Sequence, residues 1–436
     1  MASTRLDRTI SSTGNRKILT FSAWIKRSKL GVWQNVASFG QGGNRDYIAF
    51  DSSDRFEVAQ YAGGQTYQIK TTRVFRDTSA FYHIQYAIDT NQATASNRLK
   101  IYVNGVQETV FTNSSYPAED LQMYYNLSGE NQKIGSDTDN SNYFDGSMSH
   151  INYIDGTAYD ASAFGETDTT TGEWIGKTSP SVTYGTNGFF ILKDGNGITD
   201  QSGEGNDFTL GGGTLTDLKD NPDNTFATMN PLDKNTNVVL ENGNTTSYSS
   251  ADNTWVAANR ATLGIAKDKF YWEMKITGSG TANGLFFGVC ADTVALITSQ
   301  GIQDNATERA KGILLFCDNG QSQLDTNSRV NMTSAPAFND VLGCAVDRDN
   351  NTVKFYKNGS EVGSIDISSS PLATCSHIMP FMINYHTNTK FNFNFGNGYF
   401  GTTAVSSAGT NASNNGIFEY DVPTGYTALS TKGLNL

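Results

Sequence analysis

The sequence predicts an all-β protein that folds as two β-sandwiches in tandem. Three observations lead to this prediction. Short apolar runs alternate with polar residues along most of the chain, which is the pattern of half-buried strands. No long stretch follows the 3.6-residue period of an amphipathic helix, and only residues 161–164 could form a helical turn. A strand–turn–strand unit also occurs in both halves of the chain.

The first copy of this unit spans residues 82–111. The strand YHIQYAID alternates apolar and polar residues, and a polar turn separates it from a second alternating run, LKIYV. Asn104 and Gly105 follow, and both residue types tolerate the positive φ that a tight type I′ hairpin requires. We therefore expect a hairpin here, with Val110 and Phe111 on its returning strand.

The second copy spans residues 341–359 and repeats the order of features. Its strand VLGCAVD is followed by the turn RDNN, the strand VKFYK and the pair Asn358-Gly359. Asn-Gly hairpins are common, so a chance match is the alternative explanation. Because the flanking strands match as well, we favour a shared architecture with one sandwich in each half.

Length and composition fit this architecture and exclude several function classes. The chain has 436 residues, and only 17% of them are charged, against roughly 25% in an average domain. The formal net charge of −12 argues against nucleic-acid binding and against attraction to an anionic membrane. No apolar run approaches the roughly 18 residues of a membrane span, and the N-terminus lacks the apolar core of a signal peptide. We expect folding in a cytoplasm, without membrane insertion.

The cysteines all lie in the second half and are far apart in sequence. A zinc site would need ligands with short spacing, and each cysteine lies in or near a strand-like run. We expect buried free thiols that behave as small hydrophobes. They are Cys290, Cys317, Cys344 and Cys375.

The other expected elements are short strands joined by loops rich in Gly and Asn. In the first half they cover residues 19–25, 33–39, 47–50, 56–61, 66–71 and 147–155. A further strand begins at residue 133 and runs into an acidic loop. In the second half they cover residues 238–240, 254–257, 269–276, 284–290, 313–317, 378–385 and 391–395.

Several strings in the first half together resemble one known module. It is the laminin-G-like, concanavalin A-like lectin/glucanase module of tailed-phage virion proteins, especially marine ones. The resemblance covers about residues 8–230. Its main strings are GNRKILTFSAWIKRS, TTRVFRDTSAFYHIQYAIDT, NRLKIYVNG, YFDGSMSHINYIDG and FGETDTTTGEW.

The segment 185–215 sets this module apart from ordinary laminin-G-like domains. Those domains carry a DxSGxGN string near the N-terminus, whereas DQSGEGND follows the rest of the module here. We expect residues 188–193 and 208–210 to form a hairpin that folds back and completes the first sandwich.

The second half resembles a SPRY domain, which is another concanavalin A-like sandwich. FYWEMKI, LFFGV, VLGCAVDRDNNTVKFYKNG and FNFNFGNGYFG carry this resemblance over about residues 237–401. Together the two resemblances imply two concanavalin A-like jelly-roll sandwiches. The expected divisions are 1–216, a linker at 217–236, 237–401, and a tail at 402–436 that packs back onto a sandwich.

We expect no enzymatic activity. Laminarinase-type glucanases of this fold use an E-x-D-x-x-E strand, in which two carboxylates lie about 5 Å apart. The nearest string is ETDTTT, from Glu166 to Thr171, which lacks the third acid and should form a loop. The histidines are scattered, and no nucleophile-elbow, phosphate-loop or zinc-protease string occurs.

Calcium is the one ion that the sequence suggests. Ca²⁺ takes about six to eight oxygen ligands, and sandwiches of these families often hold it in loops at their rim. A solvated turn is the competing explanation, because Asp and Asn favour turns. The candidate ligands are Asp137, Asp139, Asn140, Asp194 and Asn196.

A sugar site needs an aromatic face for the pyranose ring and amide or charged groups for its hydroxyls. Loops on a rigid sandwich are the usual place for such a site. For any single aromatic residue, core packing is the alternative. The candidates are Trp33, Asn44, Arg45, Tyr47, Asn142 and Tyr143.

These observations lead us to expect a phage virion protein that mediates interaction. It would be a tail fibre, spike or capsid fibre component that contacts host-surface glycans or proteins; a capsid decoration protein and a glycan depolymerase are the alternatives. Expected partners are other virion proteins of the capsid, tail or fibre base, a host cell-surface glycan, and further copies of this chain.

Overall fold

The computed structural model describes residues 3–193, 197–252, 257–279, 284–296, 306–324 and 328–435. The chain divides into two compact units. The first comprises Met1–Asp217 with Asn221–Asp223, and the second comprises Leu218–Asp220 with Asn224–Leu436. In the described ranges, no helix has the length and apolar character needed to cross a membrane.

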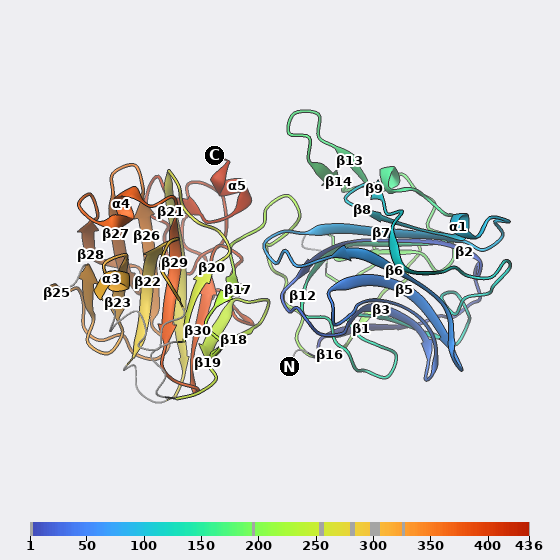
Figure 1. Ribbon diagram of the computed structural model, residues 1–436, viewed down its shortest axis with the longest axis horizontal. Coiled ribbons are helices and arrows are strands. Elements are labelled where there is room, and N and C mark those ends of the chain that lie inside the picture. Colours follow the sequence, from blue (N-terminus) through green and yellow to red (C-terminus); the bar gives the residue numbers. More distant parts are fainter. Residues whose placement is uncertain are drawn as a thin grey trace. The chain divides into compact units, whose positions relative to one another are not determined.

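The first unit is a sandwich of two antiparallel sheets (Figure 1). We call the eight-stranded one the long sheet; its order is β10-β6-β5-β4-β3-β11-β1-β16. Its strands are β1 (Arg5–Thr9), β3 (Gln34–Gln41), β4 (Asn44–Phe50), β5 (Arg55–Ala62), β6 (Gln65–Val74), β10 (Phe111–Ser115), β11 (Asn131–Ile134) and β16 (Thr209–Gly212).

The six-stranded partner, which we call the short sheet, has the order β15-β12-β2-β7-β8-β9. Its strands are β2 (Ile18–Arg27), β7 (Tyr82–Asp89), β8 (Leu99–Val103), β9 (Val106–Gln107), β12 (Gly146–Asp155) and β15 (Phe189–Ile191). The one-turn helix α1 (Ala95–Arg98) joins β7 to β8. Alternate residues of both sheets meet in one core, where Phe39 packs on Tyr125 and Tyr153 packs on Phe189.

The segment 185–215 completes the first sandwich, as expected, but it does not form a hairpin. β15 pairs with β12 in the short sheet, whereas β16 pairs with β1 in the long sheet. The two strands therefore close opposite sheets. Phe189 and Phe208, one from each end of this segment, meet in the core with ring centroids 4.8 Å apart.

The segment between β12 and β15 covers the outer side of the short sheet. It contains a 3-10 turn (Ala161–Ala163) and a small hairpin of β13 (Gly165–Thr167) and β14 (Trp174–Gly176), which stands out in Figure 1. Trp174 donates through Nε1 to His83 Nδ1 at 3.0 Å. Burial lowers the pKa of His83 to about 3, so this imidazole is neutral and its Nε2 proton faces Ser22 Oγ.

Both Asn-Gly hairpins form as predicted and share one detail. Asn104 and Asn358 both have positive φ, and so do the glycines that follow them. In each copy the Asn side chain accepts the amide of the first strand, from His83 at 2.8 Å and from Val341 at 2.9 Å.

The returning strand of the first hairpin differs from the prediction. It is β9, Val106–Gln107, whereas Val110 lies beyond it and Phe111 begins β10 of the long sheet. The chain crosses between sheets here, so the apolar residues at 110–111 indicated a strand but not which sheet it joins.

The second unit is also a sandwich. One sheet has the order β17-β20-β29-β22-β23-β24-β25. Its strands are β17 (Met229–Lys234), β20 (Ala258–Ala261), β22 (Leu285–Ala291), β23 (Gly312–Phe316), β24 (Gln321–Leu324), β25 (Ser328–Asn331) and β29 (Ile378–Asn384). Part of the expected linker is therefore a strand, because β17 pairs with β20. The strand expected at 254–257 falls largely on residues outside the described ranges.

The other sheet has the order β18-β19-β30-β21-β26-β27-β28, and β33 pairs with β21 in parallel. Its strands are β18 (Val238–Glu241), β19 (Thr246–Ser249), β21 (Lys269–Gly278), β26 (Val341–Asp347), β27 (Thr352–Lys357), β28 (Ser360–Asp366), β30 (Thr389–Asn394) and β33 (Thr427–Ala428). A small ribbon, β31 (Tyr399–Phe400) with β32 (Thr403–Ala404), and the one-turn helices α3 (Ala306–Arg309), α4 (Pro371–Thr374) and α5 (Thr431–Leu434) complete the unit.

The tail packs onto the second sandwich, as predicted. Phe418, Tyr426 and Leu429 belong to its core cluster. The buried carboxylate of Glu273, on β21, accepts the amides of Glu419 at 2.8 Å and Tyr420 at 2.9 Å. All cysteines are free thiols; Cys290, Cys317 and Cys344 are buried, and Cys375 is half-buried.

Candidate functional site

The residues predicted to bind sugar lie on or beside one side of the first unit, the outer face of the long sheet. Residues opposite one another on antiparallel strands share a face. The strand register therefore defines this face as rows of side chains across β10, β6, β5, β4 and β3. We call it the outer face. Its members are Asn35, Ser38, Arg45, Tyr47, Ala49, Glu57, Ala59, Tyr61, Gln68, Lys70 and Asn113.

An aromatic patch lies on small residues at the centre of the outer face. Tyr47 of β4 stands between Ala59 of β5 and Ser38 of β3. Trp33, which precedes β3, packs against the cluster of Tyr47, Ala49 and Ala59, and its ring centroid is 6.1 Å from that of Tyr47. The small side chains in these positions leave room for the Trp33 ring to pack on this part of the sheet.

Arg45 connects this patch to the loop after β11. Its guanidinium lies over the rings of Tyr47 and Tyr61, at 5.6 and 5.7 Å from their centroids. Its Nε pairs with Asp137 Oδ1 at 2.9 Å. The partly exposed Tyr61 and Arg45 thus offer an apolar ring and a fixed cation side by side.

A charged row borders the aromatic patch. Lys70 of β6 pairs with Glu57 Oε2 at 2.8 Å and with Asp51 Oδ2 at 3.1 Å. Burial and the Glu57 carboxylate raise the pKa of Tyr47, so its phenol stays protonated and can donate a hydrogen bond. The two carboxylates outnumber the lysine, so the row carries a net negative charge beside the patch.

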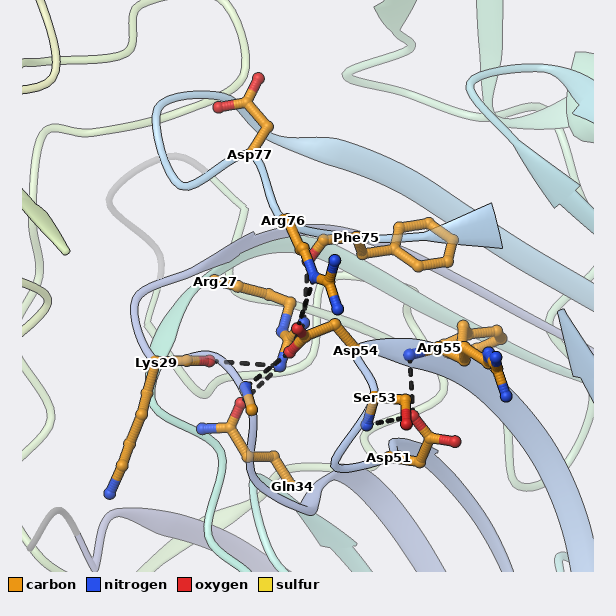
Figure 2. A network of polar contacts seen from close by, with 12 residues as sticks. Arg27, Lys29, Gln34, Asp51, Ser53, Asp54, Arg55, Phe75, Arg76 and Asp77 are labelled. Atoms are coloured by element: carbon orange, nitrogen blue, oxygen red, sulfur yellow. Dashed lines mark hydrogen bonds and ion pairs between the residues drawn. The ribbon is translucent and has the colours of Figure 1, made fainter. Parts of the chain in front are cut away.

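The loop that carries Trp33 is held by a buried ion pair below it. Figure 2 shows Arg27 and Asp54 facing each other, with Nη1 3.0 Å from Oδ1. Arg27 also donates to the carbonyls of Phe75 and Lys29, at 2.8 and 3.2 Å, while Asp54 Oδ1 accepts the Gly31 amide at 2.7 Å. This network fixes both sides of the loop from residue 28 to residue 33.

The electrostatics of this pair follow from its hydrogen bonds. Burial acts to raise the pKa of Asp54, but the Gly31 amide, Arg76 and Arg27 outweigh it and hold that pKa below its ordinary value. The carboxylate is therefore ionised at neutral pH, opposite a guanidinium whose side chain is fully buried.

The structure brings part of the predicted sugar site together. Trp33, Arg45 and Tyr47 form one patch, and Asp137 joins it through Arg45. Asn44 is exposed beside Arg45, at the turn between β3 and β4. The loop residues Asn142 and Tyr143 lie next to Asn35: the Asn142 carbonyl accepts the Asn35 amide at 2.8 Å, and Tyr143 bridges to the same residue.

The predicted calcium ligands have other partners where the structure describes them. Asp137 faces Arg45, Asp139 accepts from Ser141, and Asn140 accepts from Lys133. Asp194 and Asn196 lie outside the described residues. Among the described residues, no group of three His, Cys, Asp or Glu side chains could hold a metal ion.

Sequence reasoning missed several members of the outer face. Tyr61, Glu57, Lys70 and Asn35 were not among the predicted site residues, although all lie in or beside predicted strands. The alternation of the 56–61 run could have placed Glu57, Ala59 and Tyr61 on one side. Pairing with Lys70 and the neighbours of Tyr47 could not be inferred, because they depend on register.

The candidate glucanase string does not form a carboxylate site. Glu166 lies on the exposed strand β13, a correction to the loop expected there. Asp168 caps the following turn by accepting the amides of Thr170 and Thr171, at 2.7 and 2.8 Å.

Comparisons with known proteins identify both sandwiches. Residues 6–156 match the concanavalin A-like lectin/glucanases superfamily, and residues 269–398 match the SPRY domain. The predicted fold class, two concanavalin A-like jelly-roll sandwiches in tandem, is confirmed. A comparison with curated protein sequences finds no match.

Three of the similar solved structures are a SPRY domain, a PSpry domain and a pentraxin. The SPRY domain of human HERC1 is 17% identical, with a TM-score of 0.31, and the match covers 38% of this chain and 96% of that one. The TRIM65 PSpry domain is 11% identical, with a TM-score of 0.31, covering 38% and 88%. The heptameric SAP-like pentraxin from Limulus polyphemus is 13% identical, with a TM-score of 0.28, covering 36% and 72%.

The chain therefore combines a region that matches the concanavalin A-like lectin/glucanases superfamily with a region that matches the SPRY domain, and both regions fold as β-sandwiches.

Proposed function

We propose that this protein is a non-enzymatic component of a phage virion surface that binds host-surface glycans through the outer face of its first sandwich. The single observation that supports this most is the patch of Trp33, Tyr61 and Arg45, which lies around the buried ring of Tyr47 on the long sheet. Aromatic rings can stack on the apolar side of a pyranose, and the polar row beside them can bond its hydroxyls.

The placement in a virion rests on the resemblance of the first half to tailed-phage virion modules. In that setting the SPRY domain would contact proteins, such as a capsid, tail or fibre base, and leave the first domain to meet the cell. Further copies of the chain would raise avidity, because linked sites bind a repetitive surface more tightly than single ones.

Binding to host cells tests the glycan function. We expect purified Trp33→Ala and Tyr61→Ala proteins to bind cells at least about tenfold more weakly than the unchanged protein, since each loses one stacking ring. Tyr102→Ala is the matched control, because Tyr102 is a partly exposed strand tyrosine on the short sheet. Equal binding by all four proteins would contradict the assignment of the outer face.

Immunogold labelling of intact virions tests the location. Label at the tail tip or fibres is the expected result. Label spread over the head would favour the second candidate, a capsid decoration protein, and absence of label would contradict the virion proposal.

A depolymerase is the remaining alternative. Incubation of the protein with host polysaccharide, with and without EDTA, should release no reducing sugar. Release of product would overturn the non-enzymatic proposal.

A further inference from the structure

A polar cleft lies at the other side of the first unit, between β1 and the loop that precedes β16. Its volume is about 420 Å³, within the range of roughly 300–1,000 Å³ that small-molecule sites occupy. β3 and β11 separate β1 from β4 in the long sheet, so the cleft is distinct from the aromatic patch. Its lining residues are Asp7, Arg8, Thr9, Ser11, Gly205, Asn206, Asp207 and Thr209.

The cleft arises where two paired strands diverge. β16 pairs with β1 only as far as the Asp7–Thr209 pair, and the preceding loop then leaves the sheet edge. Arg8 bridges the gap at its inner end, because its guanidinium donates to Asn206 Oδ1 and to the Asn187 carbonyl. Arg8 therefore links β1 to the loop across the cleft.

The loop wall is held in place by its own hydrogen bonds. Asp200 accepts the amides of Phe190, Ser202 and Asn206, at 2.8, 2.9 and 2.8 Å. Asn206 Nδ2 donates to the carbonyls of Gly188 and Thr186, at 2.6 and 3.0 Å. The DQSGEGND string thus builds a preformed wall, and a ligand would not have to order it on binding.

The lining offers hydrogen bonds rather than apolar contact. Ser11 contributes a hydroxyl group, and Asp7 and Asp207 contribute carboxylates. The hydroxyls of Thr9 and Thr209 donate to Asn131 Oδ1 and to the Asp7 carbonyl, at 3.2 and 3.1 Å, and their oxygens can still accept from a ligand. Asp7 Oδ1 has no hydrogen-bond partner, although Oδ2 accepts from Arg5 at 3.2 Å. The acids are balanced by Arg8 in the lining and by Arg5 beside it, so the cleft favours neither a cation nor an anion.

A neutral ligand with many hydroxyl groups fits this set of partners, because each hydroxyl both donates and accepts. The strand register of the long sheet shows how far this cleft lies from the aromatic patch. Tyr47, Ser38, Lys133 and Asp7 lie opposite one another on successive strands. Asp7 is therefore three strand spacings from Tyr47, roughly 14 Å along the same row.

We propose that this cleft is a second saccharide site, which takes a neutral sugar residue of the same glycan that the outer face binds. The choice of a saccharide rests on the proposed function. A linear oligosaccharide laid across the strands would reach both sites, and its affinity would exceed that of either site alone.

The experiment first weakens the aromatic patch, so that binding at the cleft can be measured. In full-length Trp33→Ala protein, saturation-transfer NMR is recorded with D-glucose, D-galactose, D-mannose and N-acetyl-D-glucosamine, and with D-glucuronate as the charged comparison. We expect a signal from at least one neutral sugar and a weaker one from glucuronate. Adding Thr9→Trp should weaken the neutral-sugar affinity at least about tenfold, since the indole fills the open cleft.

Two further variants test whether the loss of sugar binding is specific to the cleft. Ser11→Phe narrows the same cleft from another position and should act in the same direction. Thr112→Trp places the same bulky side chain on an exposed position of β10, at the opposite edge of the long sheet, and should leave binding unchanged. Circular dichroism confirms that each protein is folded.

The outcomes separate this inference from the proposed function. Absence of any neutral-sugar signal in the Trp33→Ala protein, preference for glucuronate, or a signal unaffected by Thr9→Trp and Ser11→Phe would overturn the second site. Glycan adhesion through the outer face would still stand if the unchanged protein binds cells and Trp33→Ala does not.

Discussion

At the residue scale, the first sandwich depends on a few buried polar side chains that hold loops in place. Arg27 and Asp54 are the clearest example, because one pair fixes the Trp33 loop and the turn between β4 and β5 (Figure 2). A buried charge without its partner is strongly unfavourable, so such a pair is sensitive to the loss of either member.

Asp54→Asn should lower the free energy of unfolding by about 3–5 kcal/mol, because it leaves the buried Arg27 guanidinium uncompensated. Chemical denaturation, followed through the unfolding transition of the first unit, measures this change. Lys17→Met is the matched control, since its exposed pair with Asp120 should contribute less than about 1 kcal/mol. A loss for Asp54→Asn no larger than for Lys17→Met would show that the pair is not critical.

At the element scale, the two Asn-Gly hairpins show how a short string fixes a turn. Asn358 has a φ of 48° and Gly359 a φ of 80°, which only a few residue types adopt without strain. The Asn358 side chain also accepts the Val341 amide and donates to Asp340. The same residue therefore supplies both the backbone conformation and a cap for the neighbouring strand.

Replacement of Asn358 should separate these two contributions. Asn358→Ala loses the side-chain bonds and must adopt a left-handed backbone, which together should cost about 2–3 kcal/mol. Asn358→Gly keeps the backbone conformation and should cost about 1 kcal/mol. Thermal unfolding of both variants checks the order, and equal losses would mean that the left-handed conformation contributes nothing.

The tail of the second unit is held by a titratable group. Burial raises the pKa of Glu273 to about 7, despite the amides of Glu419 and Tyr420 that favour its charged form. The ordinary pKa of a glutamate side chain is 4.5. Between these two values the folded state holds a proton that the unfolded state has released, so stability falls as pH rises from 4.5 to 7.

Glu273→Gln should reduce this dependence. For the unchanged protein we expect the second unit to lose up to about 3 kcal/mol between pH 4.5 and pH 7, and the neutral amide should flatten that slope. Asp46→Asn makes the equivalent change in the first unit, because burial also raises the pKa of Asp46 to about 7. A slope in the second-unit transition that is unchanged by Glu273→Gln would contradict the assignment.

At the scale of the whole molecule, each sandwich extends beyond its recognisable family region. The superfamily match ends at residue 156, yet β15 and β16 complete the two sheets of the first unit from residues 189–191 and 209–212. Phe189 and Phe208 fill its core. The second unit likewise uses β17 before its SPRY match and Phe418, Tyr426 and Leu429 after it.

Fragments of different length test this organisation. Residues 1–217 should fold cooperatively as a separate protein, whereas residues 1–156 should not, because they lack β15, β16 and the aromatic residues that these strands bury. Circular dichroism and thermal unfolding distinguish the two. A cooperative transition for residues 1–156 would show that the later segment only decorates a finished sandwich.

Features that depend on neighbouring residues could be predicted before the structure was known. Alternation located β2, β7 and β8, and the positive φ of Asn104 and Asn358 follows from the Asn-Gly pairs themselves. The same local signals pointed to Trp33, Arg45 and Tyr47 as loop residues of a sugar site, but Tyr47 is buried in the structure. Strings of recognisable family character then indicated two concanavalin A-like sandwiches.

The sheet that each strand joins, and the side chains that meet across strands, depend on long-range pairing and could not be predicted in this way. Phe111 leaves the short sheet for the long one, and β15 and β16 separate into opposite sheets. Lys70 reaches Glu57, and Arg27 reaches Asp54, through register and chain reversal that alternation cannot specify. A period of two fixes the face of a residue within its own strand, but partners across strands depend on contacts between segments distant in sequence.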